Sequence, residues 1–338
     1  MGRSGCAVST YCLGTMTFGT ETNLAASHAQ LDRFVEAGGT LVDTADVYSA
    51  GRSEEIIGRW FADRPADLTE PVVLASKARF PVDDSPNGAG LSARHLTRGL
   101  DASLRRLQLD AIDLYQVHAW DPWTPLEETL RTLDGFVRAG KTHYYGLSNF
   151  TGWQLMKAVD LAERLNLTPP VTLQPAYSLL VREVEWEIVP AALDSGLGLL
   201  TWGPLGGGWL SGKYRRDQRP TGDTRLGEDP NRGMEAYGRR GTDRTWQIID
   251  AVQTVAEQRG ASMAQVALAW LHDRPSVTSV ILGARTIEQL DHNLQAAGLH
   301  LSAEETAALD LASAPTVGDY PYGEIGLQGR ERQLAGNR

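Results

Sequence analysis

Lysine is rare in this sequence, and acidic residues outnumber basic ones. Among 338 residues there are 32 basic side chains, of which only four are lysines: Lys77, Lys141, Lys157 and Lys213. The formal net charge is −10 and the isoelectric point is near 5.2. Such a chain lacks the basic surface that general nucleic-acid binding or attachment to an anionic membrane requires. We expect neither partner, although a local cationic pocket for one phosphate group stays open.

Cysteine and long apolar runs are also scarce. The two cysteines, Cys6 and Cys12, lie at or before the first expected strand and do not suggest a disulfide framework. No apolar run reaches the roughly 18 residues that a membrane helix needs. The first residues also lack the apolar core of a secretory signal. These absences predict a cytoplasmic protein in a reducing compartment.

What the sequence does contain is a regular alternation of strand-like and helix-like segments, with a repeat of about 30 residues. Alternation of this kind predicts a parallel sheet with crossover helices. Eight units favour a closed (β/α)8 barrel, a fold that typically takes roughly 250 residues or more. An open doubly wound sheet is the structural alternative. The expected strands are 10–14, 41–48 with its loop, 72–77, 112–118, 142–148, 171–174, 197–202 and 277–282.

Capping residues indicate where several helices begin. Ser53 and Ser92 are predicted N-caps. Residues 124–127 are predicted to form a capping box with proline at the first helical position, and Thr286 with Gln289 is a second candidate box. Further helices are expected over 151–165, 183–194 and 286–297.

Two segments depart from this regularity. From Gly206 to Asp243 the chain is rich in glycine, arginine and aspartate, and a loop of that length is usually functional or disordered. An extra helix begins at Ser302, and residues 315–338 are predicted to form a tail. No linker divides the chain. We therefore predict one barrel domain over residues 1–338, with a long loop at 206–243 after the seventh strand and an extra C-terminal helix and tail.

Four residues near the ends of successive strands carry the candidate chemistry. Asp43 ends the second strand, and Tyr48 follows in its loop. Lys77 ends the third strand and His118 ends the fourth. Taken alone, each has an ordinary explanation, as a turn residue, a packing aromatic, a solvated cation or a structural histidine. Because the C-terminal strand ends of a parallel barrel form one rim, where active sites lie, the joint placement favours acid–base chemistry there.

Several motifs resemble those of the aldo-keto reductases, and together they extend over nearly the whole chain. Any one would be weak, but their order along the chain is specific. The resemblance implies a (β/α)8 barrel and an oxidoreductase that reduces an aldehyde, ketone or keto-sugar to an alcohol by hydride transfer from NADPH. The motifs are residues 13–19, 42–48, 51–58, 75–77, 115–118, 146–150 and 283–290.

The same resemblance implies a catalytic tetrad of Asp43, Tyr48, Lys77 and His118. A free tyrosine has a pKa near 10, and a neighbouring ammonium favours the phenolate and lowers that pKa. Tyr48 is thus expected to be the general acid that protonates the new alkoxide, with Lys77 as the tuning group. Asp43 is expected to keep Lys77 charged and oriented. His118, neutral or protonated, is expected to orient the substrate oxygen and to form an oxyanion-type site with Tyr48.

Hydride transfer needs a nicotinamide cofactor, because protein side chains do not deliver hydride. No Gly-x-Gly-x-x-Gly motif follows an early strand, so a Rossmann domain is not supported. By resemblance, Ser148, Asn149 and Gln174 bind the carboxamide. Trp202, where relatives often have tyrosine, is expected to stack on the ring. Residues 203–213 are expected to surround the pyrophosphate, the alternative being a flexible turn. The full predicted cofactor set is Gly14, Thr15, Met16, Asp43, Ser148, Asn149, Gln174, Trp202, Gly203, Pro204, Leu205, Gly207, Leu210, Gly212, Lys213, Gly283, Arg285, Gln289 and Asn293.

Arg285 decides between NADP(H) and NAD(H). The helix that begins after it directs its N-terminus at whatever Arg285 binds, and a helix dipole with a fixed guanidinium suits a 2′-phosphate. By resemblance, Gln289 and Asn293 contact the adenine end. The alternative is an arginine paired with an acidic neighbour. The sequence therefore predicts NADP(H) as the cofactor, and no metal is expected.

The substrate pocket is less well indicated. Aromatic loop residues suggest an apolar or sugar-stacking pocket for a small carbonyl compound, although Trp120 and Trp123 could instead pack against the helix after the fourth strand. The compound, the direction of the reaction and the oligomeric state, including a homo-oligomer, are not indicated. The candidates are Met16, Tyr48, His118, Trp120 and Trp123, with Tyr320 and Tyr322 from the tail.

A second class of function stays open. Barrels resembling potassium-channel β-subunits share the tetrad and bind NADP while serving mainly as partners, and the tetrad alone does not separate the two. A further expectation concerns the start of the chain. Relatives carry a short strand before the turn at residues 2–5, which forms a hairpin at the bottom of the barrel, and the presence of that hairpin here is in doubt.

Overall fold

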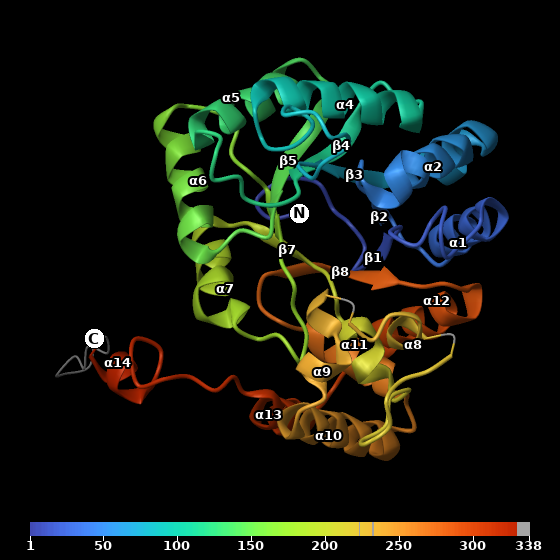
Figure 1. The fold of residues 1–338 in the computed structure, drawn as a ribbon, viewed down its shortest axis with the longest axis vertical. Helices are drawn as coiled ribbons and strands as arrows, with labels where there is room; N and C mark the ends of the chain where they lie inside the picture. Colours follow the sequence, from blue (N-terminus) through green and yellow to red (C-terminus); the bar gives the residue numbers. More distant parts are fainter. Residues whose placement is uncertain (223, 232, 330–338) are drawn as a thin grey trace.

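A closed barrel of eight parallel strands, paired in sequence order with β1 beside β8, forms the centre of the molecule (Figure 1). The structure is a computed structural model, and it describes residues 1–222, 224–231 and 233–329. The expected (β/α)8 barrel is confirmed, and the open-sheet alternative is wrong. The strands are β1 (Tyr11–Gly14), β2 (Leu41–Asp43), β3 (Val73–Ala78), β4 (Ile112–Val117), β5 (Thr142–Ser148), β6 (Thr172–Gln174), β7 (Gly198–Thr201) and β8 (Val277–Gly283).

Helices surround the barrel (Figure 1). None of the described helices is long and apolar enough to span a membrane. The longer ones are α1 (Leu24–Glu36), α2 (Arg52–Asp63), α4 (Ala93–Leu107), α5 (Leu126–Arg138), α6 (Gly152–Arg164), α7 (Val184–Ser195), α10 (Asp243–Arg259), α11 (Met263–His272), α12 (Ile287–Leu294) and α13 (Ala303–Ser313). Shorter ones are α3 (Ala66–Thr69), α14 (Glu324–Gln328), and the 3-10 turns η1 (Tyr48–Gly51) and η4 (Gln295–Gly298).

Helix α11 is absent from the sequence-based expectations. It begins with a capping box between Ser262 and Gln265, and eight of its ten residues are buried. A helix that is apolar on all sides has no polar face, so the amphipathic period that identifies other helices is missing. Burial on all sides, rather than a different backbone preference, explains why this helix escapes a periodicity argument.

Apolar side chains fill the lower interior of the barrel. Cys12, Leu41 and Leu114 belong to this inner cluster, which Met1 joins with only 6% of its surface exposed. No strand precedes β1 in the described part of the chain, and Met1 closes the bottom of the barrel where a hairpin would lie. Both cysteines are free, as expected, with Cys12 buried and Cys6 partly exposed.

Three capping predictions need correction, while Ser92 caps α4 as expected. Gly51 precedes α2, and Ser53 lies inside the first turn, where its hydroxyl lies near Thr15 and Thr44. The residue before α5 is Pro125, because the Thr124 hydroxyl donates to Asp121 instead. Thr286 does cap α12, but the Gln289 side chain accepts from Arg285 N–H rather than completing a box. In each case the side chain that was expected to cap the helix forms a hydrogen bond with a residue outside the capping motif.

The segment 206–243 is more ordered than a plain loop. Trp209 is fully buried and stacks on Tyr237 at 5.5 Å between ring centroids. This contact joins two distant parts of the segment, so the segment is ordered here, a point that the sequence left open. It contains η2 (Gly206–Ser211), α8 (Arg225–Glu228), η3 (Gly233–Glu235) and α9 (Tyr237–Arg240). The extra helix after Ser302 is confirmed as α13, and the tail runs from it to α14 away from the barrel (Figure 1). The last predicted tail residues, 330–338, lie outside the described residues.

Candidate active site

The C-terminal rim of the barrel brings the predicted tetrad together. Asp43 is the last residue of β2, Lys77 is next to last in β3, and His118 follows β4. Tyr48 opens the 3-10 turn η1, where Ser49 has a left-handed φ of 50°. The Ser49 hydroxyl donates to the Phe18 carbonyl at 2.6 Å, which holds this turn against the loop after β1. Strand ends and a tied turn therefore position all four side chains.

Lys77 is the centre of the site. Its ammonium donates one hydrogen bond to each of three groups: the Asp43 carboxylate, the Thr44 carbonyl and the Tyr48 hydroxyl. Nζ donates to Asp43 Oδ2 at 2.6 Å, to the Thr44 carbonyl at 2.7 Å and to the Tyr48 hydroxyl at 3.3 Å. An ammonium has three protons and no lone pair, so these three contacts use it completely. The Tyr48 oxygen must then act as an acceptor toward Lys77. Its own proton is free to be donated elsewhere.

The pKa values of Lys77 and Tyr48 follow from burial and from each other. Burial alone would lower the pKa of Lys77, but the Asp43 carboxylate and the Tyr48 phenol raise it above its ordinary value. Lys77 therefore stays charged. Burial raises the pKa of Tyr48, and the Lys77 ammonium opposes that rise. The ammonium acts in the predicted direction, but without a ligand the burial of the phenol outweighs it.

His118 is a neutral imidazole. Burial, together with the positive charges of Lys77 and Arg79, lowers the pKa of His118 to about 2. Its ring packs edge-on against Tyr48 at 5.9 Å and Phe80 at 4.7 Å between ring centroids. Nδ1 is buried and has no hydrogen-bond partner among the described residues. Of the two protonation states left open by the sequence, the structure favours the neutral one.

Asp43 is fixed by more than Lys77. Its second oxygen, Oδ1, accepts from Gln174 Nε2 at 2.8 Å and from Gln116 Nε2 at 3.3 Å. Gln116 was not among the predicted site residues. It lies two residues before His118 and two after Leu114, and side chains at this spacing share one face of a strand. That alternation was the available indication that Gln116 points into the barrel.

The residues predicted to bind a carboxamide lie together beside the tetrad. Ser148 ends β5 and its hydroxyl donates to the Gln174 carbonyl at 2.9 Å. The exposed Asn149 donates from Nδ2 to the His118 carbonyl at 2.9 Å and accepts from Trp202 Nε1 at 3.1 Å. Gln174 has only 3% of its surface exposed, and its amide is committed to Asp43. Gln174 thus positions Asp43, a role separate from its predicted contact with the cofactor carboxamide.

The glycine-rich turn after β7 has a conformation that requires glycine. Gly207 and Gly208 have φ values of 64° and 100°, in the left-handed region. A Cβ on Gly208 would lie 2.8 Å from Lys213 Cε, so its absence lets the lysine cross the turn. Partial desolvation and the nearby charges of Arg285 and Arg225 lower the pKa of Lys213. Three cations therefore gather beside a turn whose backbone is open to close approach.

Arg285 has acidic partners in this structure. Its guanidinium contacts Glu21 at 2.6 Å and forms two bonds of 2.8 Å to the Glu228 carboxylate. Arg285 is thus paired with acidic neighbours, as the alternative interpretation expected. A phosphate would have to displace these carboxylates or share the guanidinium with them. Among the remaining predicted residues, both in α12, Gln289 is exposed, whereas Asn293 is 94% buried.

The first-strand residues and Leu210 are placed differently from one another. Thr15 follows Gly14, the last residue of β1. Its hydroxyl donates to the Asp43 carbonyl at 3.0 Å. Met16 is exposed at the same rim. Leu210 is fully buried in the core, so only its backbone is available to a ligand. Gly203, Pro204, Leu205 and Gly212 follow β7, and Gly283 is the last residue of β8.

Comparison with known proteins agrees with this geometry. The model of the aldo/keto reductase family matches residues 11–314. This chain belongs to the aldo/keto reductase family. The members are oxidoreductases and generally use nicotinamide cofactors.

Three relatives illustrate the range of the family. The chain is 38% identical to an uncharacterized oxidoreductase, YrpG, of Bacillus subtilis, over 90% of this chain and 92% of that protein. It is 36% identical to a probable voltage-gated potassium channel subunit beta of Oryza sativa, over 88% and 89% of the two chains. It is 33% identical to a norsolorinic acid reductase of Aspergillus flavus, over 93% and 80%.

The rim of this aldo/keto reductase fits a nicotinamide cofactor. Asn149 and Trp202 offer polar and aromatic surface next to Tyr48, and the left-handed glycine turn with Lys213 suits a pyrophosphate. The roles of individual residues toward the cofactor stay predictions.

The predicted substrate residues are spread around the rim. Trp120 packs edge-on against Phe150 and against Trp153 of α6, at 5.3 and 5.4 Å between ring centroids. Trp123 is 92% exposed. From the tail, Tyr322 stacks on Trp186 at 5.3 Å. The structure therefore does not gather these aromatic side chains into one wall.

Proposed function

We propose that this aldo/keto reductase reduces the carbonyl group of an aldehyde, ketone or keto-sugar to an alcohol, with NADPH as the hydride donor and Tyr48 as the general acid. One observation carries the proposal: the fully buried Lys77 ammonium bridges the Asp43 carboxylate and the Tyr48 phenol at the barrel rim. A buried, permanently charged lysine aimed at a phenol is an arrangement that serves proton transfer.

The chemical steps are divided between the cofactor and the chain. When bound, the nicotinamide supplies the hydride that the carbonyl carbon receives. The carbonyl π electrons move to oxygen, and that oxygen takes the Tyr48 proton. Lys77 stabilises the resulting phenolate, because its Nζ already donates to the phenol oxygen. A proton from water then restores Tyr48.

His118 supports the same step as a neutral donor. An imidazole with a pKa of about 2 carries one N–H proton and no charge at neutral pH. It can therefore donate a hydrogen bond to the substrate oxygen without competing with Tyr48 as a proton source. The edge-on contact between the two rings, at 5.9 Å, places both groups on the same side of the rim.

NADPH is preferred over NADH in this proposal because of the charges near Arg285. Partial burial, and then the nearby charges of Arg285 and Arg225, lower the pKa of Lys213, so three cations lie near one another. A 2′-phosphate carries the charge that such a cluster attracts, and it suits a guanidinium through bidentate bonds. The competing carboxylates of Glu21 and Glu228 reduce this preference without removing it. From its acidic, cysteine-poor sequence we also propose a cytoplasmic location and a small-molecule partner.

A second candidate function is that of a binding partner that senses the cofactor. It is supported by the 36% identity to a protein named as a potassium channel subunit beta. In that case the same tetrad would serve slow turnover, and a second protein would be the main target. The two functions differ in turnover rate and in how firmly the cofactor stays bound.

The test follows NADPH absorbance during incubation of the full chain with a panel of aldehydes, ketones and keto-sugars. Repeated turnover with at least one class, and slower turnover with NADH, is the expected result. A single round of NADPH oxidation, with the product cofactor retained after gel filtration, would favour the binding partner. No oxidation with any carbonyl, despite measurable NADPH binding, would contradict the reductase.

A further inference from the structure

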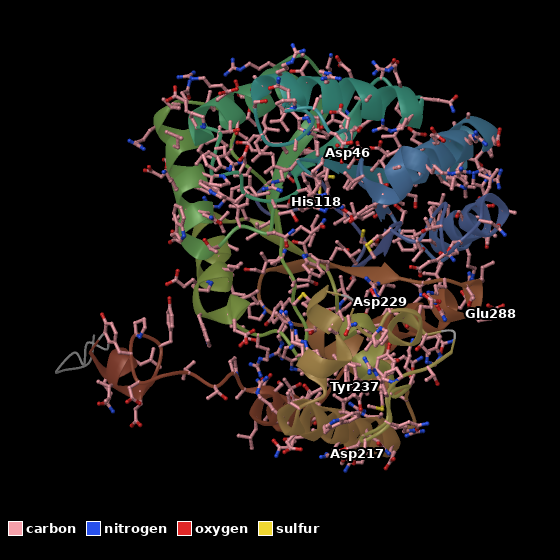
Figure 2. The ribbon with its side chains drawn as sticks, in the orientation of Figure 1. Asp46, His118, Asp217, Asp229, Tyr237 and Glu288 are labelled. Atoms are coloured by element: carbon pink, nitrogen blue, oxygen red, sulfur yellow. The ribbon has the colours of Figure 1, made fainter. Side chains whose placement is uncertain are left out.

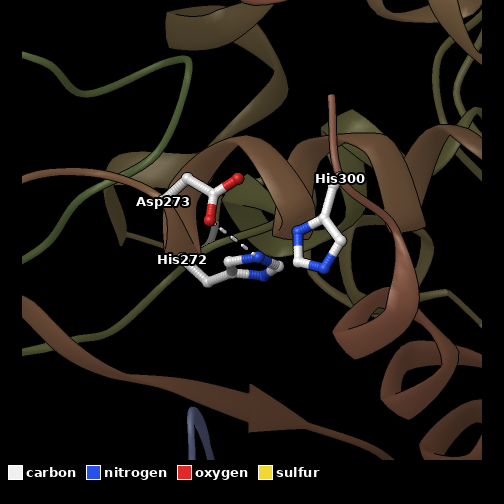
Figure 3. A group of neighbouring side chains, drawn as sticks. All are labelled: His272, Asp273 and His300. Carbon is white, nitrogen blue, oxygen red and sulfur yellow. Dashed lines mark ion pairs between the residues drawn. The ribbon is translucent and has the colours of Figure 1, made fainter. Parts of the chain in front are cut away.

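Three potential metal ligands converge at the C-terminal end of α11. His272 is the last residue of that helix, Asp273 follows it, and His300 lies in the connection between η4 and α13. Their nearest ligand atoms all lie within 4.8 Å of one another, and the described residues contain no other group of this kind. Figure 3 shows the Asp273 carboxylate and the His300 ring on either side of the His272 ring.

We propose that His272, Asp273 and His300 bind one divalent transition-metal ion, such as Zn²⁺, at the end of the barrel opposite to the active site. The sequence predicted no metal, because the two histidines are distant in the chain and show no ligand motif. The site lies outside the proposed reductase chemistry and does not depend on it.

The spacing of the three groups suits a small tetrahedral ion. With bonds of about 2.0–2.1 Å, two ligand atoms of a tetrahedral zinc site lie about 3.3 Å apart. His272 Nε2 and Asp273 Oδ1 are 3.1 Å apart and so already match that separation. Asp273 is about half exposed, and His300 is also exposed, so both side chains can rotate by the remaining distance. Three protein ligands leave a fourth position for water.

Tyr11 orients the most buried ligand. Its hydroxyl lies 2.8 Å from His272 Nδ1, and only 6% of the His272 side chain is exposed. Metal-binding histidines usually form a hydrogen bond through the second ring nitrogen, which fixes the ring and the tautomer. When an ion takes Nε2, Nδ1–H is left to donate to the Tyr11 hydroxyl, and the Nε2 lone pair faces Asp273. In that tautomer one cation can take a lone pair from each of the three groups.

The backbone around the site is held in place. The His300 carbonyl accepts from Arg259 Nη2 at 2.6 Å, and Arg259 also contacts Glu305 at 2.8 Å, which offsets its positive charge. The C-terminal end of α11 carries the negative end of the helix dipole, which favours a cation. An ion would connect α11 with the segment before α13, and Tyr11 links its site to β1.

The ligand set selects the class of metal. Two imidazoles with one carboxylate suit Zn²⁺, Ni²⁺ or Cu²⁺, whereas Mg²⁺ and Ca²⁺ prefer oxygen ligands only. Because Tyr11 begins β1, the ion lies at the N-terminal end of the strands, away from the tetrad at their C-terminal ends. Its expected effect is to stabilise the fold and leave hydride transfer unchanged.

The test titrates the metal-free full chain with Zn²⁺ by calorimetry and records its Tm with and without Zn²⁺; Co²⁺ serves as a spectroscopic substitute. We expect one ion per chain with micromolar affinity, a raised Tm, and a visible Co²⁺ absorption band. His300→Asn and Asp273→Asn should each weaken binding by at least about tenfold and abolish the Tm shift. Both replace exposed side chains, so folding should be retained. Tyr11→Phe should weaken binding about tenfold, because it removes the partner of Nδ1.

The matched control is His143→Asn. His143 also faces a carboxylate, Asp113 at 3.9 Å, but belongs to no three-ligand group among the described residues. This variant should bind Zn²⁺ like the native chain. Binding weaker than millimolar, or binding that both His300→Asn and Asp273→Asn leave unchanged, would overturn the proposal.

Discussion

The tetrad and the phosphate side of the proposed cofactor site are built in opposite ways. The Lys77–Asp43 pair has side chains that are 0% and 3% exposed, whereas the Arg285–Glu228 pair is 24% and 46% exposed. In Figure 2, His118 and Asp46 lie in the upper half of the view, and Asp229 and Tyr237 of the 206–243 segment lie in the lower half.

The two ion pairs differ in whether water or a ligand can replace one of the partners. Water cannot replace a partner of Lys77, so the geometry of the tetrad is set before a substrate arrives. Arg285 and its partners are partly solvated, and Glu21 and Glu228 come from separate segments, so an incoming phosphate can replace the carboxylates at modest cost. One region is preorganised for chemistry, and the other is exchangeable for binding.

Lys77→Met should produce the largest effect. It leaves the Asp43 carboxylate buried without its cation, and breaking a buried pair in this way costs about 3–5 kcal/mol. We expect a loss of that size in urea unfolding, together with loss of carbonyl reduction. The control is Lys141→Met, because Lys141 contacts Asp101 at 2.7 Å with side chains 41% and 39% exposed. That change should cost no more than about 1 kcal/mol. Equal losses would contradict the contrast.

Asp46→Asn should show that ionisation of the buried Asp46 carboxyl lowers the free energy of unfolding as pH rises. Burial, and then the neighbouring Glu54 carboxylate, raise the pKa of Asp46 to about 7, and the side chain is 3% exposed. The unfolded chain releases this proton near pH 4 and the folded chain near pH 7, so ionisation opposes folding as pH rises between them. The stability of the variant relative to the native chain should grow across that window by at most about 4 kcal/mol. Urea unfolding at pH 4, 5.5 and 7 measures it; a difference independent of pH would contradict it.

Arg285→Ala should have a smaller and selective effect. Loss of a charge-assisted bond to phosphate costs about 1.5–3 kcal/mol, so the Kd for NADPH should rise about tenfold or more. The Kd for NADH should stay unchanged. Fluorescence titration of both cofactors gives the two values, with Arg33→Ala as control, because Arg33 forms an exposed pair with Asp291 of α12. Equal weakening for the two cofactors would argue against a 2′-phosphate at Arg285.

The sequence was sufficient to predict the barrel and the placement of the tetrad. The strands that carry Asp43 and Lys77 near their ends, and the strand before His118, are short and mostly apolar, and parallel pairing brings their C-terminal ends together. These are properties of local pattern and topology. They need no knowledge of individual side-chain contacts.

What the sequence did not predict depends on partners that are distant in the chain. Gln116 binds Asp43, and Glu228 binds Arg285, across 73 and 57 residues. Ser53 leaves its expected cap because Thr15 offers a closer partner. The pKa of Tyr48 is raised by burial and lowered by the Lys77 charge. Three-dimensional packing determines which of the two effects is larger. Local periodicity carries no information on such pairings.

Replacement of Tyr48 by phenylalanine tests the central claim most directly. The measurement is single-turnover NADPH oxidation by a responsive carbonyl substrate, with NADPH affinity measured on the same samples and Tyr144→Phe, a partly buried tyrosine of β5, as control. The account predicts a rate about 10²- to 10⁴-fold lower in Tyr48→Phe, with NADPH affinity retained and the control near the native rate. A Tyr48→Phe chain that oxidises NADPH as fast as the native one would contradict it.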